Sequence, residues 1–159
     1  MLTQERLKEL LSYDAGTGVF CWASHGRRRR VGDVAGYWHA RSGYWYIKVD
    51  GVCYGAHRLA WLYKTGELCD EVDHRNLLRN DNRFTNLRAA TRAKNGANKL
   101  KQANNTSGYK GVSWDRCRNS WKVQIGGRSI GYFNDRVEAA RAYDEAARAA
   151  YGEFARTNL

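Results

Sequence analysis

The chain has 159 residues, with 27 lysines and arginines against 16 acidic residues, and so carries a formal charge of +11. An apolar fraction of 43%, with 13% aromatic residues, is enough for a packed core and argues against a disordered basic tail. The chain has no run of about 18–20 apolar residues, and its start, MLTQERLKELL, lacks the apolar stretch of a secretion signal. We therefore expect a soluble intracellular protein with no membrane partner, whose charge favours a polyanion such as nucleic acid.

The cysteines point to neither a zinc site nor a disulfide framework. They are widely separated, at Cys21, Cys53, Cys69 and Cys117. Zinc ligands usually come in closely spaced pairs, and a reducing cytosol disfavours disulfides. We therefore expect four buried free thiols.

The first part of the chain predicts short helices and strands. Apolar residues at 2, 7, 10 and 11, after the potential N-cap Thr3, predict a helix over residues 2–11. Residues 19–22 predict a strand. An Asp-Gly pair between two runs of β-branched and aromatic residues, 44–50 and 52–54, predicts a tight hairpin. Residues 57–64 predict a second helix.

A polar stretch without periodicity, residues 99–107, predicts a linker. Beyond it, residues 109–114, 121–125 and 128–133 predict three short strands. In the middle strand, Trp121, Val123 and Ile125 fall on one face. A helix is predicted over residues 136–151, capped by Asp135 and ended by Gly152, and its core face contains Ala139, Tyr143, Ala146, Ala147 and Ala150.

Residues suited to phosphodiester hydrolysis gather between positions 71 and 95. Asp73 places a hard oxygen ligand beside His74, a base whose pKa is ordinarily near neutrality. Asn86 follows in a strand-like piece, and Asn95 lies in the first turns of a helix that Thr91 is placed to cap. One divalent cation, one base and surrounding arginines are the parts that metal-assisted hydrolysis needs.

The order and spacing of four residues resemble the HNH nuclease motif of phage and group I intron homing endonucleases: Asp73, His74, Asn86 and Asn95. The resemblance extends over about residues 1–98 and implies a ββα-metal site. It implies that His74 is the general base and that Asn86 orients it by a hydrogen bond. Asp73 and Asn95 would hold one Mg²⁺ or Mn²⁺ ion. A purely structural role explains any one of these residues, but not all four at this spacing.

Three residues near this motif call for separate expectations. Relatives often carry Pro where Cys69 stands and Gly where Leu77 stands, so the loop around the motif is open to a different path. His57 lies outside the four-residue motif, and we expect it to pack beside the site.

Basic residues surround the motif in the sequence. From Arg75 to Lys101 there are eight basic residues and one acid. Scattered charge is usually a solvated surface, but the scarcity of acids here favours phosphate contacts. Arg88 is equally suited to brace the fold, and the Arg27–Arg30 run is either a phosphate-binding loop or a solvated one. The candidates for DNA contact in this region are Arg75, Arg79, Arg83, Arg92 and Lys94.

Residues 107–158 resemble the Apetala/ethylene-response-factor DNA-binding domain through four segments: 109–112, 121–125, 130–133 and 138–147. The resemblance implies that a three-stranded sheet, backed by one helix, enters the major groove. Ser113 and Ser129 replace an arginine and a tryptophan of the plant family, so its recognition sequence does not carry over. The candidate DNA-contacting residues are Lys110, Arg116, Arg118, Lys122, Gln124 and Arg128.

The sequence thus predicts an α+β protein with three parts: an N-terminal HNH ββα-metal nuclease module (1–98), a linker (99–107) and a small three-stranded antiparallel sheet packed on one helix (108–159). The predicted activity is metal-dependent cleavage of double-stranded DNA by a phage- or prophage-type homing endonuclease, acting in the bacterial cytoplasm. The alternatives are a non-cleaving, transcription-factor-like DNA binder and an RNA-binding protein. No obligatory protein partner is evident, and a double-strand break would need a homodimer or two successive nicks.

Overall fold

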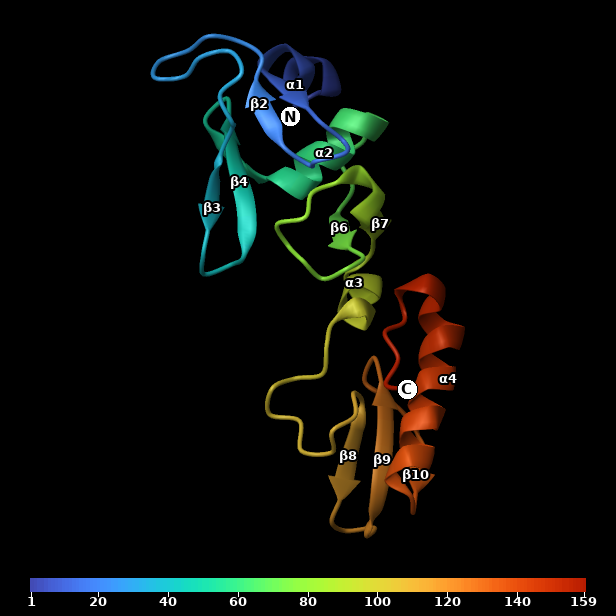
Figure 1. Cartoon of the computed structure of the whole chain (residues 1–159). Helices are drawn as coiled ribbons and strands as arrows, with labels where there is room; N and C mark the ends of the chain where they lie inside the picture. Colours follow the sequence, from blue (N-terminus) through green and yellow to red (C-terminus); the bar gives the residue numbers. More distant parts are fainter. The chain divides into compact units, whose positions relative to one another are not determined.

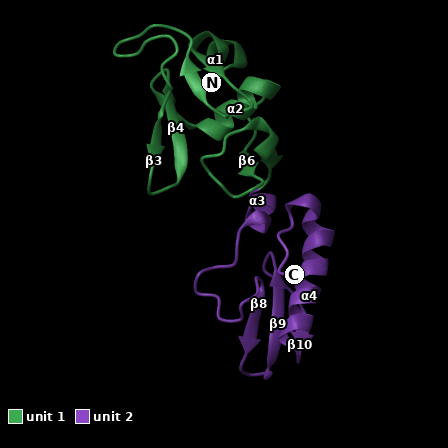
Figure 2. Ribbon diagram, in the orientation of Figure 1, with its two compact units in different colours: residues 1–91 green, residues 92–159 purple.

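The computed structural model describes all residues, 1–159, and divides into two compact units, Met1–Thr91 and Arg92–Leu159 (Figure 2). Helices and strands are mixed in both units, which confirms the predicted α+β class. Unit 2 begins at helix α3 (Arg92–Asn98), so this helix and the predicted linker residues belong to the same unit as the C-terminal sheet.

Unit 1 opens with α1 (Gln4–Leu10), which begins as predicted because the Thr3 hydroxyl accepts a hydrogen bond from the backbone N–H of Arg6. Strand β1 (Leu11–Tyr13) follows directly and pairs antiparallel with β2 (Phe20–Trp22). The strand at residues 19–22 was predicted, whereas β1 is too short to show alternation in the sequence.

A three-stranded antiparallel sheet follows, in the order β3 (Tyr37–His39), β4 (Tyr44–Val49) and β5 (Val52–Gly55). Asp50 and Gly51 both adopt positive φ, at +46° and +84°. Two such residues form the turn whose twist matches that of the flanking strands. The predicted hairpin is therefore confirmed.

The rest of unit 1 consists of one helix and a second hairpin. Helix α2 (Ala56–Thr65) confirms the predicted second helix. Strand β6 (Glu71–His74) pairs antiparallel with β7 (Leu87–Ala90), which follows the short 3-10 helix η1 (Phe84–Asn86). The buried core of the unit includes Leu7, Leu11, Phe20, Ile47, Val49, Leu59 and Leu62.

The sheet of unit 2 has the order β10 (Arg128–Phe133), β9 (Ser120–Ile125) and β8 (Val112–Asp115), all antiparallel. Figure 1 shows α4 (Arg136–Tyr151) lying along this sheet, before η2 (Gly152–Phe154). The helix begins where the sequence predicts, because the carboxylate of Asp135 accepts a 2.7 Å hydrogen bond from the Glu138 N–H.

The core of unit 2 lies between the sheet and α4, where Val123 and Ile125 meet Ala139, Tyr143 and Ala147. The prediction that Ala150 shares this core is wrong, since its side chain is exposed. In the last turn of α4 the partly buried Tyr151 packs against this core, and Ala150, one residue before it, points to a different side of the helix.

The prediction of buried cysteines is also wrong. Cys53 and Cys117 are exposed, and Cys21 and Cys69 are half-buried, although all four are free thiols. Cys53 lies on the outward face of β5, and Cys117 lies in the turn between β8 and β9. No helix has the length and apolar composition that a membrane span requires.

Candidate active site

The β6–β7 hairpin carries two of the predicted site residues. Asp73 and His74 end β6, and they pair with Arg88 and Leu87 of β7. Both side chains are buried, with 3% and 4% of their surface exposed. The sequence predicted a strand-like piece at Asn86, but Asn86 ends the 3-10 helix η1, and the strand that pairs with β6 begins one residue later, at Leu87.

A buried ion pair compensates the charge of Asp73. The Nε and Nη2 atoms of Arg88 donate to Oδ2 of Asp73 at 2.9 and 2.8 Å. Arg88 is itself only 6% exposed. A charge buried to this degree needs such a partner, so Arg88 braces the hairpin from within rather than offering its guanidinium to a ligand.

His74 is held by an asparagine that the sequence did not single out. Its Nε2 atom lies 3.2 Å from the side-chain oxygen of Asn82, which is also buried. Because an amide oxygen can only accept, Nε2 carries the proton in this contact and the Nδ1 atom keeps the lone pair. Burial lowers the pKa of His74, despite the opposing influence of Asn82 and Asp73, so the ring is neutral at pH 7.

Two further rings pack against this histidine. The centroid of the His57 ring lies 5.1 Å from that of His74, and Tyr44 lies 4.9 Å from His57 and 5.9 Å from His74. The Nδ1 atom of His57 is buried without a hydrogen-bond partner. Burial lowers the pKa of His57 to about 3, with the neighbouring His74 as the second cause. The site is therefore lined by neutral aromatic and imidazole rings.

Asn86 fixes the loop between the two strands. Its side-chain oxygen accepts from the backbone N–H of Asn76 at 3.0 Å, and its side-chain nitrogen donates to the carbonyl of Asp81 at 2.8 Å. The hydrogen bond that we expected from Asn86 to His74 comes instead from Asn82. Asn86 thus holds the loop in which Asn82 lies.

Asp81 gathers the remaining loop contacts. Arg83 donates to its two carboxylate oxygens at 2.8 and 2.6 Å, and Asn76 donates at 2.7 Å. These bonds, led by the one from Arg83, lower the pKa of Asp81 to about 2. Leu77, within the same loop, has a φ of +67°, a conformation that favours glycine. At the position where relatives often carry Gly, this loop keeps the backbone that glycine would adopt.

The predicted metal ligands separate between the two units. Asp73 belongs to unit 1, whereas Asn95 belongs to α3, the first element of unit 2. Their pairing stays a prediction from the sequence. The donor set fits a hard divalent cation, because both side chains offer oxygen atoms, although Oδ2 of Asp73 already accepts from Arg88. No group of three or more His, Cys, Asp or Glu side chains is arranged to hold a metal ion.

The predicted DNA-contacting residues of unit 1 have different environments. Arg75 and Arg79 are exposed in the loop after His74. Arg79 lies over the Tyr44 ring, 5.0 Å from its centroid, and donates to the Ser42 carbonyl. The guanidinium of Arg83 is paired with Asp81, as described above. The exposure of Arg75 and Arg79 is compatible with the predicted phosphate contacts, which stay a prediction.

The first helix of unit 2 carries two more of these candidates. Arg92 and Lys94 are exposed on α3. The Lys94 ammonium lies 5.1 Å from the centroid of the Phe154 ring, within the same unit. Their exposure is compatible with the predicted phosphate contacts, which stay a prediction.

The sheet of unit 2 presents three of its six candidates on one face. Lys122 and Gln124 alternate with the core residues of β9 and so face away from α4. Arg118 lies over the ring of Tyr132, 4.2 Å from its centroid. The register places Tyr132 opposite Lys122, on the same face. The two remaining candidates are exposed at the ends of the strands: Arg116 and Arg128.

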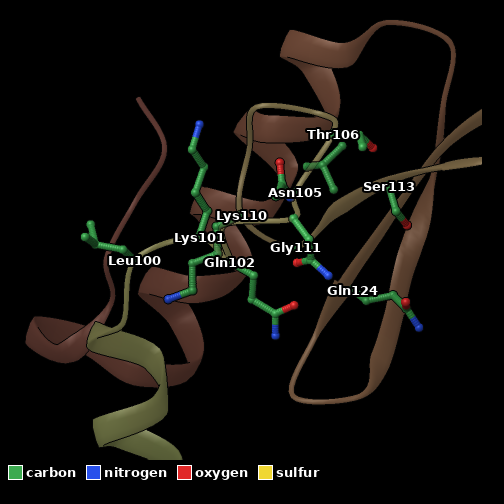
Figure 3. Close-up of a pocket in the computed structure, with 11 residues that line it drawn as sticks. Leu100, Lys101, Gln102, Asn105, Thr106, Lys110, Gly111, Ser113 and Gln124 are labelled. Carbon is green, nitrogen blue, oxygen red and sulfur yellow. The ribbon is translucent and has the colours of Figure 1, made fainter. Parts of the chain in front are cut away.

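Lys110 differs from the other candidates because its ammonium is already engaged. It donates to the backbone carbonyls of Ala97 and Lys99, at the C-terminal end of α3. Burial lowers its pKa. Lys110, Gln124 and Ser113 help to line a cavity of about 440 Å³ beside the sheet (Figure 3). Its lining is largely polar, but the lysine that the sequence favoured for DNA contact holds α3 instead.

Sequence reasoning missed Tyr44 and Asn82 and set His57 aside. Tyr44 is signalled only by its place at the start of an aromatic strand, and Asn82 only by the polar loop around it. Neither signal specifies contact with His74, because each contact joins elements that are distant in the sequence.

The comparisons with known proteins bear on this same region. A family model described as HNH endonuclease matches residues 54–97, which run from the end of β5 through α2 and the β6–β7 hairpin to α3. No curated protein and no solved structure matches the chain. The matched segment includes His57 and all four residues of the predicted motif. Residues 54–97, in the middle of the chain, therefore resemble the HNH endonuclease family.

Proposed function

We propose that this protein is a metal-dependent DNA endonuclease that hydrolyses phosphodiester bonds with His74 as the general base. The observation that carries the proposal is a buried, neutral histidine beside an aspartate, on the β-hairpin of an HNH endonuclease domain. A neutral imidazole can take a proton from an attacking water molecule at pH 7.

The residues around His74 have separate roles in this proposal. Asn82 orients the imidazole ring through its contact with Nε2. Asp73 and Asn95 are the ligands that we propose for one Mg²⁺ or Mn²⁺ ion. Such an ion, when bound, stabilises negative charge on the phosphate and on the leaving oxygen. Arg75 bears an exposed positive charge next to the histidine and is suited to bind the substrate phosphate.

For unit 2 we propose a DNA-binding role that selects the cleavage site, as in a homing endonuclease of phage or prophage type. The support is the outward face of its sheet, which combines Lys122, Gln124 and an arginine stacked on Tyr132. Lysine suits phosphates or guanine edges, and glutamine suits adenine. Alanine at Lys122 and Gln124 should weaken DNA binding while leaving cleavage at saturating protein unchanged.

A supercoiled plasmid tests the nuclease directly and separates it from a non-cleaving, transcription-factor-like DNA binder. With Mg²⁺ present, we expect nicked or linear product, and with a chelator in excess we expect none. A protein that binds the plasmid but never relaxes it, in Mg²⁺ or in Mn²⁺, would be a DNA-binding protein only.

A further inference from the structure

Five rings form a continuous series in unit 1, which we call the aromatic row: Tyr37, Tyr46, Tyr44, His57 and His74. Their centroids are separated by 6.2 Å between Tyr37 and Tyr46, and by 6.4 Å between Tyr46 and Tyr44. From Tyr44 the row continues to His57 at 4.9 Å and to His74 at 5.9 Å. It therefore begins on the surface and ends at the proposed general base.

The strand register explains why the tyrosines share a face. Tyr37 is paired with Tyr46, and His39 is paired with Tyr44, so these four side chains leave the same side of the sheet. The buried residues of β4, Ile47 and Val49, fall on the opposite side. Tyr37 is 52% exposed, so the outer end of the row is accessible to solvent.

The surroundings of the row are basic. Arg79 lies over the Tyr44 ring, and the exposed Lys48 alternates onto the same face of β4. Arg41 is exposed in the turn between β3 and β4. No acidic residue occurs in strands β3, β4 or β5. Exposed rings beside positive charge are the combination that binds nucleic acid through base stacking and phosphate attraction.

We propose that the aromatic row binds unpaired nucleotides of the DNA strand that is to be cut. This proposal rests on the proposed nuclease function, because the inner end of the row is His74, the proposed general base. Bases within a duplex are stacked on one another and cannot stack on Tyr37 or Tyr46. A single strand, or a locally opened duplex, offers free base faces worth about 1–3 kcal/mol each on an aromatic side chain. The preferred substrate is therefore DNA with unpaired bases beside the scissile phosphate.

Fluorescence anisotropy of the full-length protein with a labelled short oligothymidylate, in the presence of a chelator, measures this binding without cleavage. Replacing Tyr37 by alanine should weaken binding about tenfold, and Tyr37→Phe should retain it, since phenylalanine keeps the ring. Trp38→Ala is the matched control, because Trp38 lies on the same strand, is 45% exposed and faces the other side. Equal losses in Y37A and W38A, or equal affinity for the corresponding duplex, would overturn the proposal.

The native thiol of Cys53 provides a second readout that needs no substitution. Its sulfur lies 3.7 Å from the Tyr37 hydroxyl and is exposed on the same face. Bound oligothymidylate should slow alkylation of Cys53 more than that of Cys69, a half-buried thiol of unit 1 that lies outside both proposed DNA-binding surfaces. Unchanged reactivity of Cys53 under saturating oligonucleotide would refute nucleotide binding at the aromatic row, even if the plasmid is cut. Protection of Cys53 in a protein that never cuts the plasmid would refute the proposed nuclease activity but support nucleotide binding at the aromatic row.

Discussion

Arg88 compensates the charge of Asp73 inside the β6–β7 hairpin, and this ion pair joins the two strands that carry the site. The ion pair is buried at both ends. Removing one partner of a buried pair commonly costs about 3–5 kcal/mol, because the other charge then lacks compensation. We predict that Arg88→Met lowers the free energy of unfolding by about that amount in urea denaturation.

Arg83→Met is the control for this prediction, because Arg83 also pairs with an aspartate but is largely exposed. Exposed pairs contribute little to stability. Similar losses in the two variants would mean that the Asp73–Arg88 contact does not stabilise the hairpin in the way that its burial indicates.

His57 makes stability depend on pH. Its pKa falls from 6.5 to about 3 on folding, so between these values the unfolded chain binds more protons than the folded one. Stability should therefore be complete above pH 6.5 and decrease as the pH falls towards 3, by about 3 kcal/mol between pH 7 and pH 4. Urea denaturation of wild type and His57→Phe at several pH values measures this. The variant should lose much of the dependence, and an unchanged slope would rule out His57 as its source.

At the scale of elements, the sequence predicted those whose signals are local. The Thr3 and Asp135 caps, the Asp50-Gly51 turn and the end of α4 at Gly152 each depend on a few adjacent residues. Strands β1 and β3 were missed, since three residues show no period and their pairing is decided by distant partners.

The same distinction applies to the candidate site. The motif residues Asp73 and His74 were visible as a sequence pattern, and the two strands around them followed. His57 was expected beside the site and lies there, whereas Tyr44 and Asn82 were not visible, because they arrive from β4 and from the loop before β7. The positions of these side chains are determined by packing between elements that are distant in the sequence, which local propensities do not encode.

Gly111 is required by the contact between β8 and α4. A Cβ atom there would lie 2.2 Å from the buried ring of Tyr143 and 2.7 Å from the carbonyl of Gln124. Gly127 has a similar φ, +84° against +72°, but open space around it. Both alanine variants place a side chain on a backbone with positive φ, which glycine adopts more easily. Only Gly111→Ala also forces the Tyr143 ring to move. We predict that Gly111→Ala costs about 1–3 kcal/mol more than Gly127→Ala, measured by thermal denaturation. Equal destabilisation of the two variants would show that α4 and Tyr143 shift to accommodate the added methyl group at little cost in free energy.

At the scale of the whole molecule, the charge of +11 becomes easier to interpret. Two of the arginines near the motif, Arg83 and Arg88, are paired with aspartates. Arg75 and Arg79 are exposed near the motif in unit 1. In unit 2, Lys122 faces outward from the sheet. Exposed basic side chains thus lie on both units, which agrees with the proposed binding of DNA.

The predicted motif is divided between the two units, because Asp73, His74 and Asn86 belong to unit 1 and Asn95 belongs to unit 2. Asn95 lies on α3, whose end is held within unit 2 by Lys110 and by the backbone N–H of Arg156, both of which donate to the Ala97 carbonyl. Deleting residues 107–159 would remove these contacts from the helix that carries Asn95. Loss of cleavage in such a truncated protein would therefore not isolate a role in site selection, whereas substitutions on the sheet face do.

The most direct test of the central claim is the cleavage rate of a supercoiled plasmid by wild type, His74→Ala and His25→Ala in Mg²⁺. His25 is an exposed histidine outside the HNH domain and serves as the matched control. Loss of a general base commonly slows a reaction about 10²–10⁴-fold, so His74→Ala should lose cleavage to that extent while binding DNA as tightly as wild type. His25→Ala should cut at the wild-type rate. Cleavage by His74→Ala at the wild-type rate would contradict the account.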